Sequence, residues 1–130
     1  MVRKKAFTLM EITVIVTVLV LLASIAAATH KSRVRAAKES VLKHNLSELR
    51  FTLDAYNADR GHYPESLGTL LDEGYLRDIP VDPFTGSGDT WEVIYEEDIA
   101  DEDSSYIPGV FDIRSGSERE ALDGTFYNEW

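Results

Sequence analysis

A long apolar run begins at position 7 of the chain. Positions 7 to 28 carry a single charged residue, Glu11, and are otherwise apolar or uncharged. Because an α-helix rises about 1.5 Å per residue, these 22 residues form a helix of about 33 Å, which is long enough to cross the hydrocarbon core of a bilayer. The pattern predicts a membrane-spanning helix that carries a carboxylate near its start.

After this run, apolar positions recur every three or four residues. Such spacing is typical of one face of an amphipathic helix, and it predicts that the helix continues to about Asp59. Gly61 and Pro64 then act as stop signals, because glycine readily adopts the left-handed conformation that ends helices and proline cannot continue one. The apolar positions concerned are Val34, Ala37, Val41, Leu42, Leu46, Leu49, Leu53 and Tyr56.

The rest of the chain predicts a small mixed domain. Three leucines at helical spacing within Glu65–Asp72, followed by Gly74, predict a short helix that packs back on the long one. Alternating apolar residues from Trp91 to Tyr95 predict one strand, and Gly109–Arg114 predicts a second through Phe111 and Ile113. The predicted fold class is α+β, a long N-terminal helix packed against a small antiparallel sheet.

Composition limits the functions that remain. A chain of 130 residues has room for one core, and the absence of cysteine excludes disulfides, thiolate zinc sites and thiol nucleophiles. Positions 1 to 50 carry nine basic and three acidic residues, a balance of +6, whereas positions 51 to 130 carry four and twenty, a balance of −16. The basic half suits anionic lipid headgroups, and the acidic half would be repelled by phosphates, so nucleic acid is not an expected partner.

The flanks of the apolar run set its orientation. Three basic residues at positions 3 to 5 favour a cytoplasmic N-terminus, with the chain from His30 onward on the outer face. The small residues of Ala23–Ala28 also fit an ordinary secretory signal peptide, whose removal would release a secreted calcium-binding or catalytic domain. Against this alternative, the run is longer than the ~7 to 15 residues of a signal peptide, and the helical pattern continues past Ala28.

Glu11 requires a partner within the membrane. A carboxylate at membrane depth costs about 2.5 to 3.5 kcal/mol, and such groups are usually paired. No other residue between positions 7 and 28 is charged, so the partner must come from elsewhere. The free α-amino group of a newly made N-terminus is a compact cation that would serve. Glu11 therefore predicts proteolysis just before the apolar run and contact between neighbouring copies.

The segment Lys5–Glu11, followed by the apolar run, resembles the class III signal of type IV pilin-like proteins. The resemblance implies that a prepilin peptidase cuts between Ala6 and Phe7 and methylates the new amino group of Phe7. It also implies that Glu11 and Phe7 of neighbouring copies pair during assembly. The family normally has glycine where this chain has Ala6.

Motifs in the tail resemble those of the major pseudopilins of type II secretion systems. They are Tyr63–Leu67, Gly74–Leu76, Ile79–Phe84, Asp112–Ser117 and the ending from Asp123 to Trp130. The resemblance implies an inner-membrane subunit that forms a helical homopolymer, a periplasmic pseudopilus that supports export of folded proteins. Its implied partners are minor pseudopilins, the prepilin peptidase, an inner-membrane assembly platform and the lipid bilayer. A type IV pilus or competence pilin remains the alternative.

This resemblance divides the chain into four parts. They are a prepilin leader at 1–6, a transmembrane and assembly half of the helix at 7–29, an amphipathic half at 30–60, and a periplasmic head with a C-terminal loop at 61–130.

Two acidic loops are candidate cation sites. Hard oxygen donors and glycines in the C-terminal loop suit Ca²⁺, and major pseudopilins bind calcium in the corresponding loop, which implies a site at Ser115, Ser117, Glu118 and Asp123. Alternatively, the side chain of Arg119 replaces the ion with a salt bridge. The acidic run Glu96–Asp103 lacks the EF-hand arrangement and is interpreted as a solvated loop.

No enzyme signature stands out. The sequence has no Gly-x-Ser-x-Gly elbow, no phosphate-binding loop and no His-Glu-x-x-His motif. The three histidines lie on or at the end of the long helix. We therefore expect a structural protein rather than an enzyme.

Overall fold

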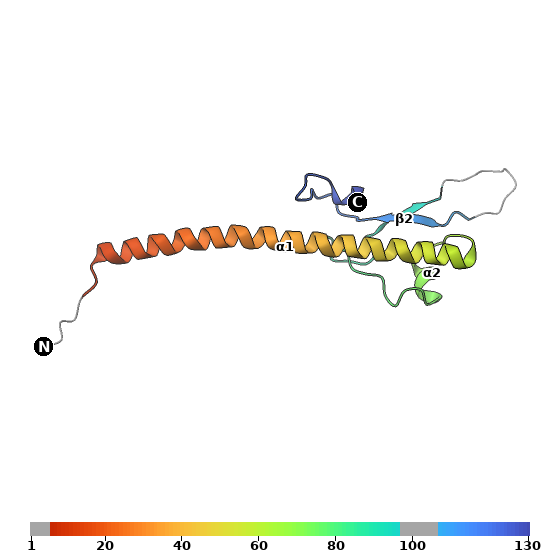
Figure 1. The fold of residues 1–130 in the computed structure, drawn as a ribbon, viewed down its shortest axis with the longest axis horizontal. Coiled ribbons are helices and arrows are strands. Elements are labelled where there is room, and N and C mark those ends of the chain that lie inside the picture. Colours follow the sequence, from red (N-terminus) through yellow and green to blue (C-terminus); the bar gives the residue numbers. More distant parts are fainter. Residues whose placement is uncertain (1–5, 97–106) are drawn as a thin grey trace. The chain divides into compact units, whose positions relative to one another are not determined.

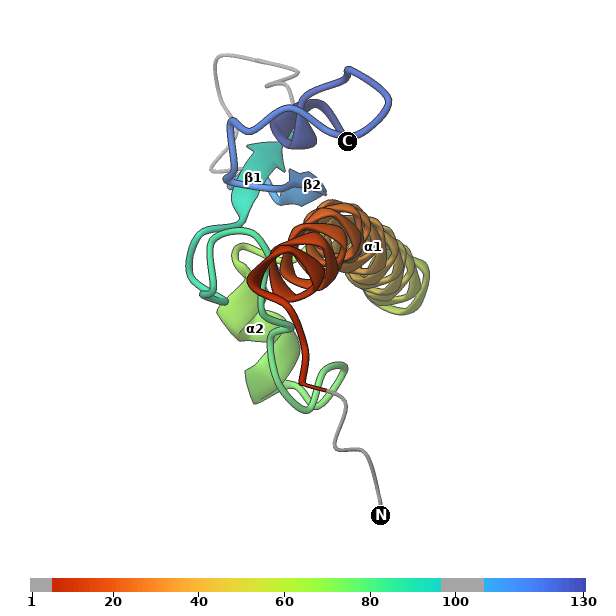
Figure 2. The same ribbon diagram turned by 90° about the vertical axis from the view of Figure 1, so that its left-hand side faces the viewer.

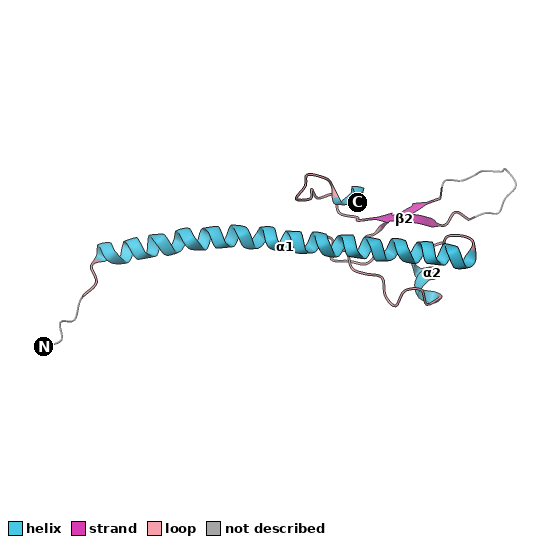
Figure 3. Ribbon diagram, viewed as in Figure 1, coloured by secondary structure: helices cyan, strands magenta, loops and turns pink. Residues whose placement is uncertain are grey.

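The computed structural model describes residues 6–96 and 107–130. It contains one long helix, one short helix, two strands and a 3₁₀ turn, and it confirms the α+β fold class (Figure 3). The described residues belong to two compact units, Met1–Ala36 and Ala37–Trp130. The elements are α1 (Leu9–Arg60), α2 (Leu67–Asp72), β1 (Glu92–Tyr95), β2 (Val110–Arg114) and η1 (Tyr127–Glu129).

In the first unit, the start of α1 is capped by Thr8. Its hydroxyl accepts a hydrogen bond from the Glu11 amide at 3.2 Å, and its carbonyl accepts one from the Ile12 amide at 3.2 Å. A threonine followed three residues later by glutamate is the sequence pattern of a capping box. The helix start is therefore encoded locally, next to the predicted cleavage position.

The helix of this unit is long and apolar enough to cross a membrane. Helix α1 contains an 18-residue window of mean hydropathy 2.6, none of which is buried inside the chain. The hydroxyls within it donate to carbonyls three or four residues earlier, so no hydroxyl donor is left to face lipid unpaired. These residues are Thr13, Thr17, Ser24 and Thr29.

The second unit folds around one stripe of α1. Five apolar residues spaced four and three apart are buried there, and α2 and the sheet lie on different sides of this part of the helix (Figures 1 and 2). Residues from α2, β2 and η1 complete the core, including Leu70, Ile113 and Tyr127. The helix stripe consists of Leu42, Leu46, Leu49, Leu53 and Tyr56.

The predicted stop signals are confirmed. Helix α1 ends at Arg60, and Gly61 follows with φ of 78°, the left-handed conformation expected of a helix-ending glycine. Helix α2 is two residues shorter at its start than the predicted Glu65–Asp72, because Ser66 takes the N-cap position and its hydroxyl accepts from the Thr69 amide.

The sheet corrects one sequence-based expectation. Strand β2 was expected to alternate through Phe111 and Ile113, but Val110 and Ile113 are buried while Phe111 is half exposed. Ile94 pairs with Asp112 and the next residue, Tyr95, pairs with Val110, so Phe111 is the extra residue of a β-bulge. A bulge inserts one residue and breaks the period of two, which explains the difference.

The predicted amphipathic stripe is covered along only part of its length. Burial begins at Leu42, whereas Val34, Ala37 and Val41 stay exposed in the single chain. All three are exposed although their spacing is that of the stripe, so within the part of the chain that the structure describes the covered stripe begins at Leu42.

Gly116 provides a test of how the head is packed. A Cβ added there would lie 2.0 Å from the carbonyl oxygen of Thr90, a backbone atom that no rotamer change can move. Gly116→Ala should therefore lower the free energy of unfolding by about 3 kcal/mol. Gly68→Ala is the matched control, since its Cβ would meet only the Ser66 hydroxyl at 3.4 Å. Tryptophan fluorescence during denaturation of the full chain in detergent measures the stability of each variant. Equal denaturation midpoints for Gly116→Ala and Gly68→Ala would contradict this packing.

Candidate assembly site and C-terminal loop

The predicted assembly residues lie together at the start of α1. Ala6 and Phe7 precede the helix and are exposed, and Glu11 is exposed in its first turn. The backbone of Glu11 is engaged with Thr8, while its side chain is accessible to another molecule. The geometry thus leaves the carboxylate available for a partner outside the chain.

Glu11 has a second physical role that sequence reasoning missed. A carboxylate in the first helical turn interacts favourably with the positive end of the helix dipole, and the Thr8 cap strengthens the same turn. The Thr-x-x-Glu spacing was a readable signal for this role. Any test of Glu11 in assembly must therefore separate pairing between chains from the stability of the helix start.

Two of the predicted calcium ligands serve the fold. The Ser115 hydroxyl is buried, donates to Asp82 Oδ2 at 2.5 Å and accepts from the Ser117 amide at 3.1 Å. Ser117 is buried as well, and its hydroxyl accepts from the Arg119 amide. These bonds fix the path of the loop as it leaves β2.

Asp82 is the centre of this arrangement and was missed as a structural residue. It is fully buried, and its Oδ1 accepts from the amides of Phe84 at 2.8 Å and Thr85 at 3.4 Å. Its second oxygen holds Ser115, so one carboxylate joins two loops far apart in the sequence. The local sequence Asp-Pro-x-x-Gly, ending at Gly86, was the available signal, since aspartate bonding to amides two and three residues on is typical of turns.

The other two predicted ligands, Glu118 and Asp123, are exposed carboxylates. Asp123 Oδ1 accepts from the Thr125 amide at 3.0 Å and from its hydroxyl at 2.6 Å. These hydrogen bonds, together with the charge of Lys43, lower the pKa of the Asp123 carboxyl, so it is ionised at neutral pH. No group of three histidine or acidic residues suited to a metal lies within residues 6–96 and 107–130.

The donor set therefore fits calcium in part. Two accessible carboxylates are oxygen ligands of the right kind, but Ca²⁺ takes six to eight oxygens, so backbone carbonyls and water would have to supply the others. Arg119, proposed as a replacement for the ion, has its guanidinium 6.0 Å from the centre of the Phe84 ring. Most of the second candidate, the acidic run, lies outside the described residues; of it only Glu96 is described, and that residue follows β1.

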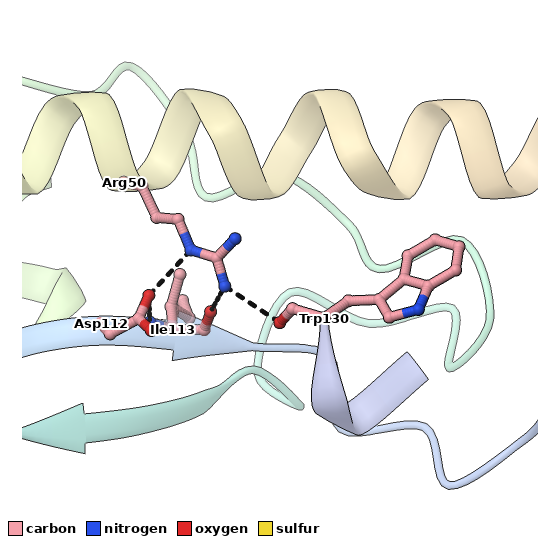
Figure 4. A network of polar contacts seen from close by, with 4 residues as sticks. All are labelled: Arg50, Asp112, Ile113 and Trp130. Atoms are coloured by element: carbon pink, nitrogen blue, oxygen red, sulfur yellow. Dashed lines mark hydrogen bonds and ion pairs between the residues drawn. The ribbon is translucent and has the colours of Figure 1, made fainter. Parts of the chain in front are cut away.

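Polar anchors on α1 hold the C-terminal segment. Arg50 donates from Nε to Asp112 at 2.8 Å and from one terminal nitrogen to the carbonyl oxygens of Ile113 and Trp130, both at 2.9 Å (Figure 4). Three turns earlier, Glu39 Oε1 accepts from the Leu122 amide at 2.7 Å and from the Tyr127 hydroxyl at 2.8 Å. Between them, the Lys43 ammonium lies 4.4 Å from the centre of the Trp130 ring.

A groove of about 590 Å³ runs beside these anchors. It is lined by α1 and by the C-terminal segment, and its charged groups include Lys43, Arg50, Asp54 and Asp123. Arg50 is committed to β2 and Trp130, and Asp123 is committed to Thr125. The groove therefore marks the line along which α1 and the C-terminal segment pack.

Comparison with characterised proteins identifies relatives of this chain. It is 32% identical over 98 residues to the type II secretion system core protein G of Pseudomonas aeruginosa, a match that covers 63% of this chain and 69% of that protein. It is 29% identical over 98 residues to the protein of the same name from Dickeya chrysanthemi, covering 63% of this chain and 64% of that protein. No protein-family model and no solved structure matches the chain. With this identity and a long N-terminal helix packed against a small antiparallel sheet, the chain belongs to the family of type II secretion system core protein G, the major pseudopilins.

Proposed function

We propose that this chain polymerises into a periplasmic pseudopilus that supports the export of folded proteins across the outer membrane. One observation carries the proposal: Glu11 is the sole charged residue between positions 7 and 28, and its side chain is exposed in this otherwise apolar first part of α1. The α-amino group of Phe7 on a neighbouring copy is the cation that completes it. This pairing sets the axial register between adjacent subunits, a role that buried polar groups are known to play.

Lateral packing of the apolar helices supplies the cohesion. The large apolar side chains of the first unit, from Phe7 to Ile25, are exposed in the single chain. In the bilayer they contact lipid, and in a filament outside it they must contact one another, since water would otherwise cover them. This exposure is expected of a subunit whose apolar helix is buried only when it packs against other copies of the chain.

The proposed function also implies the processing and the partners of the chain. The chain enters the inner membrane with its N-terminus in the cytoplasm and its head in the periplasm. A prepilin peptidase removes residues 1 to 6 and methylates Phe7. The subunit then joins further copies and minor pseudopilins on an inner-membrane assembly platform. Its own role is structural, so neither a catalytic residue nor an energy source is assigned to it.

Calcium binding by the C-terminal loop is part of this proposal. Asp123 and Glu118 are accessible carboxylates, and the hydrogen bonds that lower the pKa of Asp123 favour its charged form, which is the form that binds a cation. Ser115 and Ser117 shape the loop through their bonds to its buried framework. Backbone carbonyls and water would complete the coordination.

The mature N-terminus tests the processing step. When the full chain is coexpressed with a prepilin peptidase, mass spectrometry should find protein that begins at Phe7 with a methylated amino group. Removal of the leader is required because an amide nitrogen at position 7 carries no positive charge. Retention of Met1, or a start near Thr29, would overturn the assignment.

Substitution of Glu11 tests the assembly step. Glu11→Ala should insert into membranes and fold its head normally, yet yield no filaments by electron microscopy, because the register contact is lost. Thr8→Ala is the matched control: it removes the cap and costs about 0.5 to 2 kcal/mol of helix stability, but it keeps the carboxylate.

We expect Thr8→Ala to assemble. Normal filaments from Glu11→Ala would remove the pairing mechanism. Loss of filaments in both variants would instead show that Glu11 acts by stabilising the first turn of α1.

Thermal unfolding tests the calcium site. Added Ca²⁺ at about 100 times its dissociation constant should stabilise the head by about 2.7 kcal/mol relative to chelator. Asp123→Asn should abolish this shift, whereas Asp78→Asn, an exposed carboxylate elsewhere on the head, should keep it. Identical melting curves in calcium and in chelator would exclude the site.

A further inference from the structure

The outer edge of β1 faces away from the rest of the sheet. In the part of the chain that the structure describes, β2 is the strand beside β1, and it lies between β1 and the second half of α1 (Figures 2 and 4). The Glu96 amide donates to the Gly109 carbonyl at 3.0 Å, so the backbone of Glu96 points toward β2. Successive residues of an antiparallel strand point alternately toward and away from their partner. The backbone groups of Val93 and Tyr95 therefore point outward.

These outward groups have no partner among the described residues. The bulge at Phe111 lies on β2, so the alternation along β1 is regular. Outside the ladder with β2, no backbone hydrogen bond joins Val93 or Tyr95 to another described residue. Unpaired amides and carbonyls on an edge strand are a template for a further extended segment. The edge of β1 can therefore accept a third strand.

A groove of about 270 Å³ follows the same edge. Val93 and Tyr95 line it together with Leu67, the first residue of α2, and with Ile79. Asp89 also lines it and supplies a carboxylate. When a strand is added to a sheet, main-chain hydrogen bonds hold it and pockets beside the edge select its alternate side chains. The lining of this groove favours apolar side chains at every second position of the added strand.

The opposite face of β1 favours basic residues at the other positions. Side chains alternate between the two faces of a strand, so Glu92 lies on the face away from the groove, and it is exposed. Arg114, which pairs with Glu92, belongs to β2 and lies on the side away from the free edge. Positions 51 to 130 carry four basic and twenty acidic residues, a balance of −16. Opposite charges on adjacent strands stabilise their pairing, and like charges oppose it.

The basic residues of this chain do not form such a strand within the described residues. Those of positions 51 to 130 are Arg60, Arg77, Arg114 and Arg119, each at least five positions from the next. The basic residues between positions 31 and 50 belong to the helix α1. Acidic edges of two copies would also repel each other. A strand with basic residues at every second position must therefore come from a different protein.

We propose that the free edge of β1 binds an extended segment of another protein in which apolar residues alternate with lysine or arginine. The apolar side chains enter the groove beside α2, and the basic side chains lie on the face that carries Glu92. All residues of this site belong to the head. The contact therefore requires neither the pairing of Glu11 nor the proposed calcium site.

A synthetic peptide of alternating valine and lysine tests this contact on the full chain in detergent micelles. Amide hydrogen exchange, followed by NMR, should be fast at Val93 and Tyr95 in the free chain and about tenfold slower with peptide, because their amides gain acceptors. The Glu96 amide, already bonded to Gly109, is the internal reference and should be protected in both samples. A peptide of alternating valine and glutamate is the matched control probe and should protect neither outward amide.

Proline at position 95 tests the direction of the backbone. Tyr95→Pro removes an outward N–H and keeps the ladder with β2, since proline is tolerated on edge strands where its nitrogen faces away from the partner. It should weaken binding of the valine–lysine peptide about tenfold through the lost hydrogen bond. Tyr95→Ala is the matched control, because it removes the side chain and keeps the amide, and it should bind more tightly than Tyr95→Pro. Protection of the Glu96 amide verifies that the sheet of each variant is intact.

The outcomes separate strand addition from other ways of binding. Peptide binding without slower exchange at Val93 and Tyr95 would show attraction by net charge alone and would overturn the contact. Equal protection by the valine–glutamate peptide would overturn the basic partner. Slow exchange at both amides before any peptide is added would show that a second copy or another part of the chain covers the edge, and would also overturn it. None of these results depends on filament formation, so failure here leaves the proposed function intact.

Discussion

The structure depends on the fact that an ionised carboxylate is not stable alone in hydrocarbon. Glu11 lies in the first turn of a helix whose next charged side chain is Lys31. No basic residue between them can neutralise it, and the head is built around α1 residues from Leu42 onward. In the proposed assembly, a second molecule offsets this cost of about 2.5 to 3.5 kcal/mol. The proposed pairing would therefore determine both the partner of a free monomer and the position at which that partner binds.

The head is built on the second half of α1. Its core uses α1 from Leu42 to Tyr56, and the polar anchors Glu39, Lys43 and Arg50 hold the C-terminal segment to the same stretch of helix. The Arg50 guanidinium connects β2 with Trp130, as Figure 4 shows. Anchoring by charged and hydrogen-bonded groups lets a domain with a two-stranded sheet keep a defined position on the helix, although such a small sheet is marginal by itself.

Most of the fold could be predicted from spacing and turn residues, because helix periodicity and glycine or proline stop signals are local. The end of α1 and the existence of α2 and both strands followed from such signals. The β-bulge at Phe111 did not, since a bulge depends on the pairing of two strands and leaves no period in one of them. Asp82 was also missed: its role arises from contact with Ser115, 33 positions away in sequence. For the same reason, four residues grouped by sequence as a calcium site proved to have two different environments.

A buried ion pair adds little net stability, because desolvation of both charges offsets most of their attraction. The proposed pairing of Glu11 with an amino group would therefore explain the register between subunits better than their cohesion. Apolar helices also gain little by associating while lipid surrounds them, since lipid tails are as apolar as leucine. Cohesion becomes large only when the helices leave the bilayer and water is the alternative neighbour. A filament of the proposed kind would therefore be stable outside the membrane and separable within it, and the polar pairing at Glu11 would decide which arrangement of copies forms.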